Sequence, residues 1–174
     1  GDMKVTARVY GTGSWATGGN MNTASGDQSG FGLQTAAIAA GGTTGAGNYN
    51  NHSELYNGAS WTELAAMNTP RRSASGFGAS TAGVNASGQT TGGGVTANVE
   101  NWNGSAWTEI ADVNTAGRGL SASASGTATA AIVFFRHSTQ TITESWDGSS
   151  WTEVNDANTG RFLTGGAGIQ TAAI

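Results

Sequence analysis

The sequence of 174 residues contains no cysteine, one proline and one lysine, Lys4. Without cysteine the chain can form neither a disulfide framework nor a thiolate-bound metal site. Charged residues make up only 10 % of the chain and its net charge is −4, whereas a nucleic-acid surface needs a basic stripe. No apolar run approaches the length of a membrane span. We therefore expect neither a nucleic acid nor a membrane as partner.

Glycine and aromatic residues are abundant instead. The chain has 29 Gly, 6 Trp, 5 Phe and 3 Tyr. Disordered chains are usually charged and poor in aromatic residues. The composition, together with the regular spacing of the tryptophans, therefore predicts a folded domain.

Three markers recur in the same register four times along the chain. Tryptophans separated by 46, 46 and 44 residues form the first marker (Trp15, Trp61, Trp107 and Trp151). A second aromatic stands five residues before each tryptophan (Tyr10, Tyr56, Trp102 and Trp146), and an Asn-Thr pair begins seven residues after each one (Asn22, Asn68, Asn114 and Asn158). An arginine follows three of these pairs (Arg71, Arg118 and Arg161). A fixed period of this length indicates a repeat architecture.

Each repeat is predicted to form two hairpins of short strands. The dipeptides Asn57-Gly58, Asn103-Gly104 and Asp147-Gly148 lie between the aromatic markers, where they predict tight turns. Small residues upstream predict a second hairpin, with first strands at 29–32, 75–78, 123–126 and 165–168 and second strands at 35–38, 81–84, 129–132 and 171–174. No segment has the apolar period of a helix, so we predict an all-β fold.

Four short strands over about 45 residues match the size of one propeller blade. We predict one domain over 1–174, with four-stranded blades at approximately 29–66, 73–112 and 121–156, and a fourth in which 163–174 joins 3–18. Small side chains suit the crowded strand nearest the axis, and large aromatic ones suit the widening wedge outside it. Each tryptophan is expected to fill the seam between neighbouring blades, because one blade cannot bury its own faces.

These residues resemble the kelch repeat. The kelch blade carries Gly-Gly after its second strand, Tyr in the third, Trp in the fourth and Pro-Arg before the next blade, which Gly41-Gly42, Tyr56, Trp61 and Pro70-Arg71 match. The later copies depart from the pattern, with Trp in place of Tyr and no double glycine at that place. The regular spacing also resembles kelch-like repeats of marine phage virion proteins and environmental bacterial proteins. The resemblance implies a β-propeller used for binding and, in its narrower form, an extracellular or virion-associated location.

The sequence leaves the closure of the ring open. The chain starts with an outer hairpin, at 5–10 and 14–17, and ends with an inner one, and the two together make a complete blade. A ring closed by pairing these segments has no free sheet edge and would be a monomer. In the alternatives the chain is a fragment of a longer array, or two copies join end to end as a dimer by exchanging segments.

No candidate active site emerges from the motifs. Residues 11–16 match a loose phosphate-loop pattern, but such a loop needs a helix after it and the other copies have a hairpin turn there. His52 and His137 have no ligand spacing around them, while a catalytic zinc takes three protein ligands. The pair Glu54 and Glu63 recurs in the next two copies, whereas a glycosidase needs its carboxylate pair once. We therefore predict no catalytic residue, metal or cofactor, and a structural role for the glutamates as acceptors of bonds from Thr or Arg.

The loops that differ between the copies are the candidate binding surface. Residues 42–51, 89–98 and 136–141 vary in sequence, and variable loops on one face of a repeat protein are its usual binding surface. Their neutral polar residues suit a glycan or a protein partner, and inert connections are the alternative. The favoured interpretation is a non-enzymatic binding or structural module on a surface or virion. An intracellular protein-interaction adaptor and a polysaccharide-active enzyme are the alternatives.

Overall fold

A computed structural model describes residues 17–45, 47–123, 126–134, 140–160 and 165–173. These residues form β-strands, turns and loops and contain no helix, so the all-β prediction is confirmed. Most strands belong to three four-stranded antiparallel sheets. The first contains β1 (Ser29–Leu33), β2 (Ala36–Ala40), β3 (Ser53–Tyr56) and β4 (Trp61–Glu63); the second contains β6 (Ser75–Ala79), β7 (Ala82–Ala86), β9 (Val99–Trp102) and β10 (Trp107–Ile110); the third contains β11 (Ser121–Ala122), β12 (Ala131–Phe134), β13 (Thr143–Trp146) and β14 (Trp151–Val154).

Two smaller sheets complete the described strands. One pairs β5 (Arg71–Arg72) with β8 (Gln89–Thr90), and the other pairs β15 (Gly168–Ile169) with β16 (Ala172–Ala173). A hairpin was predicted here, with strands at 165–168 and 171–174; the second strand lies within its predicted range, but the first begins at Gly168 and shares only that residue with its predicted range. Most of the segment predicted to complete the fourth copy, residues 3–16, lies outside the described part of the chain.

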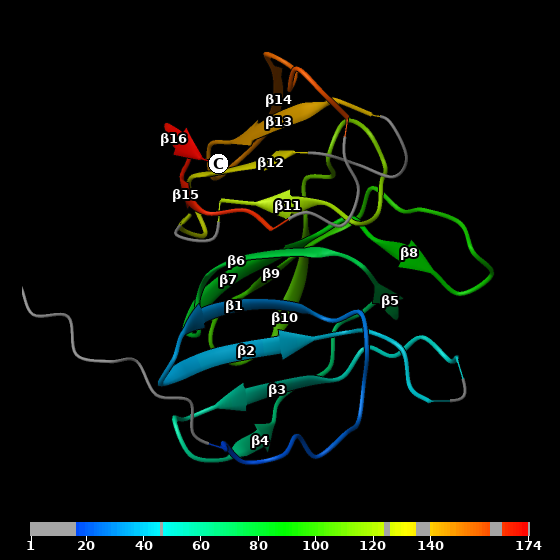
Figure 1. The fold of residues 1–174 in the computed structure, drawn as a ribbon, viewed down its shortest axis with the longest axis vertical. Helices are drawn as coiled ribbons and strands as arrows, with labels where there is room; N and C mark the ends of the chain where they lie inside the picture. The colour runs from blue at the N-terminus through cyan, green and yellow to red at the C-terminus, as the bar shows by residue number, and fades with distance from the viewer. Residues whose placement is uncertain (1–16, 46, 124–125, 135–139, 161–164, 174) are drawn as a thin grey trace, which may run out of the picture.

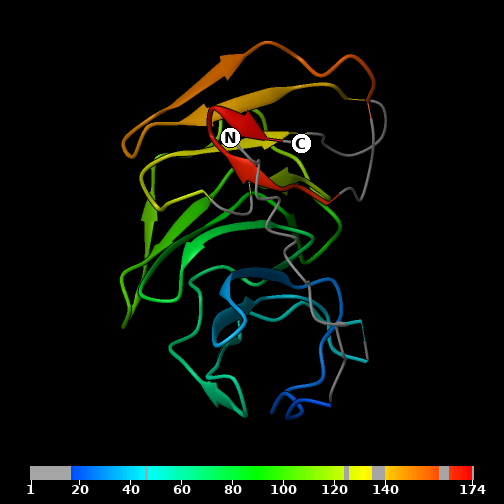
Figure 2. The same ribbon diagram turned by 60° about the vertical axis from the view of Figure 1, so that its left-hand side comes forward.

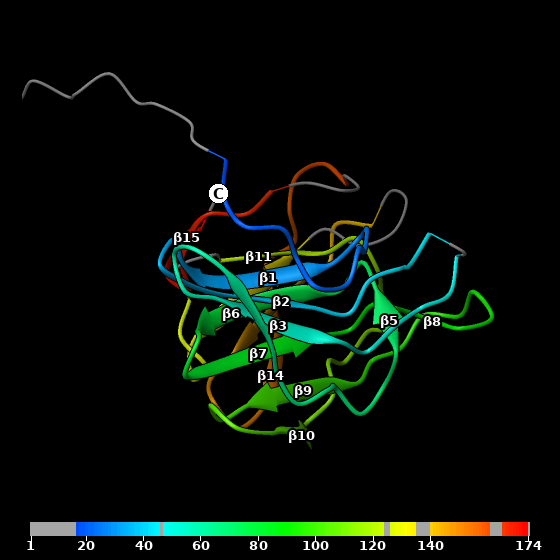
Figure 3. The ribbon, with the colours of Figure 1, turned by 90° about the horizontal axis from the view of Figure 1, so that it is seen from below.

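The three large sheets meet through their first strands. β1 lies beside β6, and β6 lies beside β11. The sheets fan out from this line, so that β4, β10 and β14 lie at the outside of the molecule (Figures 1 and 3). Figure 2, turned by 60°, shows the β15–β16 hairpin against the third sheet. There Gln170 Nε2 donates to Ser145 Oγ (2.8 Å) and to the carbonyl of Trp146 (2.7 Å).

Small residues permit the close approach of these first hairpins. A Cβ atom on Gly83 would collide with the ring of Phe31, which belongs to the neighbouring sheet, and one on Gly76 would lie 2.9 Å from the same ring. Contacts that short do not occur between ordinary side chains, so the packing of β1 on the β6–β7 hairpin requires glycine at both positions.

The buried apolar side chains form two clusters, each between two neighbouring sheets. Phe31 and Ile38 of the first sheet pack with Trp102 and Trp107 of the second, and residues of the second sheet such as Phe77 pack with tryptophans of the third. The core of the molecule therefore consists of its inter-sheet seams.

The outer hairpins turn where the Asn-Gly and Asp-Gly dipeptides predict. Only the glycines, Gly58, Gly104 and Gly148, have positive φ there, at 97°, 94° and 95°. The preceding residue acts through its side chain: Asn57 Oδ1 accepts hydrogen bonds from the backbone N–H groups of Ala59 and Ser60. The turn thus combines a left-handed glycine with a side-chain cap, and Asn need not be left-handed as well.

The first strand of the third copy was placed wrongly from the sequence. It is β11, Ser121–Ala122, and not 123–126. The Gly126 N–H donates to the Ser123 carbonyl, and Thr127 and Ala130 exchange two backbone hydrogen bonds. These bonds turn the chain before it can extend a strand as far as the other copies do.

Candidate functional site

The three buried glutamates of the repeat each hold the preceding copy. Glu54, Glu100 and Glu144 are at most 1 % exposed. Each glutamate binds the Asn-Thr pair upstream of it. One carboxylate oxygen accepts hydrogen bonds from the backbone N–H and the side-chain amide of the Asn, and the other oxygen accepts one from the backbone N–H of the Thr. We call this arrangement the glutamate clasp. The recurring glutamate of one copy therefore binds the recurring Asn-Thr pair of the preceding copy across the seam.

The clasp at Glu100 also contains a buried ion pair. Arg71 Nη2 lies 3.0 Å from Glu100 Oε1, and the arginine side chain is 0 % exposed. The guanidinium also donates to the carbonyls of Asn85 and Asn98, both at 3.2 Å. Burial lowers the pKa of Arg71 from its ordinary value, and the negative charge of Glu100 opposes that shift.

The two members of each glutamate pair lie in different surroundings. Glu54 and Glu63, like the two later pairs, are cross-strand partners in one sheet. The first member of each pair is buried in its clasp, and the second is exposed on the outermost strand. The buried carboxylates hold backbone groups of their own chain, which is the structural role expected from their recurrence.

Tryptophans of the outermost strands lie at the seams. The ring of Trp107 meets Phe31 of the previous sheet edge-on, with centroids 6.2 Å apart, and its Nε1 donates to Ser53 Oγ. Trp151 repeats this arrangement on Phe77 (6.3 Å), and its Nε1 donates to the carbonyl of Ala111. Trp61 is only half-buried and donates to the carbonyl of Gly19. In all three cases the indole donates to the preceding copy.

The other aromatic marker stabilises the sheet that contains it. Trp102 and Trp146 donate from Nε1 to the carbonyls of Ser80 and Ala128, which lie in the first hairpin turn of the same copy. Tyr56 packs on Trp61 with ring centroids 5.0 Å apart, and its hydroxyl donates to the carbonyl of Gly58. Tyr10, Trp15 and Arg161 lie outside the described residues.

Arg118 does not repeat the role of Arg71. It is partly exposed, and no ion pair of Arg118 is found within the described ranges. The spacing explains the difference, because Arg71 follows Asn68 by three residues and Arg118 follows Asn114 by four. The extra residue places the two side chains at different positions of the repeat.

The candidate binding loops are joined by a cluster that the sequence did not reveal. Gln89 Oε1 accepts from Tyr49 OH (3.1 Å) and from Arg72 Nε (3.0 Å), and the guanidinium of Arg72 lies 5.0 Å from the centre of the Tyr49 ring. Arg72 also forms an ion pair with Asp27 (3.1 Å). We call these four residues the rim cluster. Its only sequence signal is the Arg71-Arg72 doublet, in which the first arginine is buried and the second reaches the loops.

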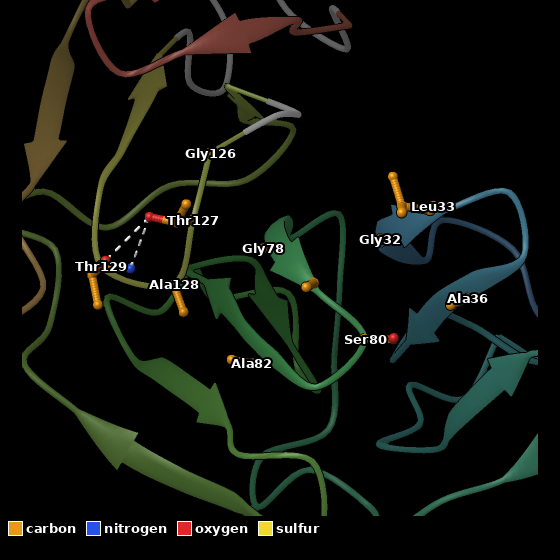
Figure 4. A pocket seen from close by; sticks show the side chains of 11 residues that line it. Gly32, Leu33, Ala36, Gly78, Ser80, Ala82, Gly126, Thr127, Ala128 and Thr129 are labelled. Carbon is orange, nitrogen blue, oxygen red and sulfur yellow. Dashed lines mark hydrogen bonds between the residues drawn. The ribbon is translucent and has the colours of Figure 1, made fainter.

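The opposite end of the molecule has an open apolar hollow. The tips of the first hairpins of three copies surround a volume of about 530 Å³ (Figure 4). Its lining includes Gly32, Gly78 and Gly126, and Leu33 beside it is 73 % exposed. Thr127 and Thr129 hydrogen-bond one another at its edge. The lining contains no charged side chain and therefore provides no acid, base or nucleophile pair.

The described segments contain no group of three His, Asp or Glu side chains that could hold a metal ion. His52 is half-exposed and lies 3.5 Å from the exposed carboxylate of Glu63, while His137 lies outside those segments. No helix there is long and apolar enough to cross a membrane.

No protein-family model matches the chain, and no curated protein matches its sequence.

Proposed function

We propose that the chain is a four-bladed kelch-like propeller that acts as a non-enzymatic binding module through the loops around the rim cluster. The resemblance of the repeat to kelch proteins and the three fanned sheets support the propeller. The fourth copy supports the number of blades: a hollow at the loop end of the molecule is lined by Ser29, Ser75 and Ser121 of the first three copies and by Gly166 of the fourth.

The repeat register gives this closure a testable form. Ala173 occupies the position of Ala37 in the first copy, and Ala37 pairs with Tyr56. Tyr10 is the counterpart of Tyr56, so we expect a strand at 5–10 to lie beside β16 with Tyr10 opposite Ala173. Pairing in this register would complete the fourth sheet without leaving a free edge.

Disulfide trapping tests the closure, because the chain has no native cysteine. Tyr10→Cys together with Ala173→Cys should oxidise to a cross-linked monomer on non-reducing gels. Cross-linked dimers would indicate exchange between two chains, and no cross-link would contradict the register. Thr12→Cys with Ala173→Cys serves as the mismatched control.

Binding through the loop rim rests on one observation above all. Loops from two different copies, 42–51 and 89–98, extend from the same end of the sheets (Figure 3) and are held together by the rim cluster. A surface assembled from several copies, with sequences that differ between them, is the usual binding surface of a repeat protein. A recognition role on a virion or cell surface follows from the narrower resemblance.

Two matched variants locate the binding surface. Val95 and Leu33 are both exposed aliphatic residues, at 46 % and 73 %, but they lie at opposite ends of the molecule. We expect binding on a glycan array or to immobilised surface proteins to be lost with Val95→Glu and kept with Leu33→Glu. The opposite pattern would move the site to the apolar hollow, and absence of binding by the native chain in both formats would refute the proposal.

A further inference from the structure

A second, smaller hollow lies at the centre of the loop end. The first strands of the three large sheets and the fourth copy surround a volume of about 190 Å³, with Gln28 at its edge. One water molecule takes about 30 Å³ of liquid, so the hollow has room for a small molecule. Its lining contains no charged side chain.

Two polar side chains of this lining have no partner among the residues that the structure describes. Ser75 is only 4 % exposed and its hydroxyl makes no hydrogen bond there, although the hydroxyl of the equivalent Ser29 donates to the Ala40 carbonyl. The carboxamide of Gln28 makes none either. Gln28 is partly exposed at the edge of the hollow, but Ser75 is buried, and buried polar groups are nearly always hydrogen-bonded. The Ser75 hydroxyl therefore points to a polar ligand.

The frame of the hollow is fixed by backbone bonds. Asp27, Ser73 and Gly119 stand 46 residues apart and all have positive φ, at 55°, 51° and 63°. The N–H of Ser73 donates to the carbonyl of Asp27, and the N–H of Gly119 donates to the carbonyl of Ser73, both at 2.8 Å. Non-glycine residues in this conformation are uncommon and occur where the surroundings demand it. The frame is therefore set before any ligand enters.

We propose that this axial hollow binds one terminal sugar ring of a neutral glycan, an inference that rests on the binding function proposed above. A hydroxyl and a carboxamide can each donate and accept hydrogen bonds, which complements the hydroxyls of a sugar. A calcium or magnesium ion would need several converging oxygen ligands, carboxylates among them, and an anion would need a cationic or N–H-rich site. An apolar ligand would leave the buried Ser75 hydroxyl unsatisfied.

Nuclear magnetic resonance of the ¹⁵N-labelled chain tests this assignment. The probes are the methyl glycosides of glucose, galactose, mannose and N-acetylglucosamine. For at least one of them we expect saturable shifts of the backbone amides of Gly30, Gly76 and Gly166. Loss of one hydrogen bond should weaken binding about two- to tenfold in Ser75→Ala and in Gln28→Ala. Ser80→Ala, in the apolar hollow at the other end, is the matched control and should bind as the native chain does.

The outcomes separate this inference from the broader proposal. Shifts confined to the loops around Val95 would show that sugars bind at the rim, which would refute the axial site and retain the binding function. No shift with any glycoside would refute the sugar assignment, and the array and surface-protein experiments would still decide whether the chain binds at all. Equal affinity of the native chain and both axial variants would also refute the axial site.

Discussion

Removing the Glu100 carboxylate should destabilise the protein more than removing any equivalent carboxylate that lacks an arginine. In Glu100→Ala the Arg71 guanidinium, which is 0 % exposed, loses its ion pair, and the backbone N–H groups of Asn68 and Thr69 lose their acceptor. Breaking a buried ion pair costs about 3–5 kcal/mol because the remaining charge is uncompensated. Glu54→Ala orphans the same kind of backbone donors without a buried charge, so its cost should be about 1–3 kcal/mol.

Urea titrations followed by tryptophan fluorescence measure both free energies of unfolding. A second comparison isolates the charge: Glu100→Gln combined with Arg71→Met should be more stable than Glu100→Gln alone, since the double variant buries no unpaired cation. Coupling energies between residues in contact reach about 0.5–3 kcal/mol. The reasoning is refuted if Glu100→Ala costs no more than Glu54→Ala, or if Arg71→Met gives no recovery.

Three further changes test the seams and the turns. Trp107→Ala should lower the free energy of unfolding by about 3–5 kcal/mol in a denaturant titration. Trp61→Ala should lower it clearly less, because Trp61 is only half-buried, although the repeat alone suggests an equal cost. Equal losses would contradict the seam geometry. Gly83→Ala should cost about 1–3 kcal/mol through overpacking, while Gly45→Ala, with nothing within 4 Å of the added atom, should be neutral. Hydrogen bonds from Ser150, and to a smaller extent from Ser149, lower the pKa of Asp147 to about 2. The charged carboxylate therefore stabilises the folded state above the ordinary pKa of Asp, and this stabilisation is lost as the pH falls towards 2. Carboxyl chemical shifts should show that midpoint, and Asp147→Asn should remove the acid dependence without changing stability at neutral pH, because two other hairpins carry Asn there.

The strand pairing was predictable because it depends on local signals. Asn57-Gly58 and its counterparts specify tight turns, and the antiparallel order within each sheet follows from hairpins joined in sequence. The glutamate clasp was not predictable in detail, although both of its parts recur in the sequence. Glu54 lies 32 residues from Asn22, and periodicity alone does not show which markers meet across a seam.

The rim cluster and the axial hollow were hidden for a different reason. Arg118 stands 46 residues after Arg72, at the same position of its copy, but Tyr49 and Gln89 have no counterpart in another copy, so the recurring residues do not predict the cluster. The hollow depends on how closely the first strands approach, which is decided by contacts such as that of Gly83 with Phe31. Features that are unique to one copy, or that form only where several sheets pack together, cannot be predicted from the repeat and become visible only in the structure.

The residues that all copies share hold the sheets together, whereas the residues that differ between copies lie in the loops proposed to bind a ligand. Each clasp binds the preceding copy with the same atoms, so a substitution in it alters a seam on which neighbouring sheets depend. The loops after β2 and β7 differ in sequence between the copies, and surface loops tolerate such changes better than the strands that they connect. A ligand recognised by this protein would therefore be selected by the loops and by the axial hollow that they surround, while the glutamates and tryptophans keep the sheets in place.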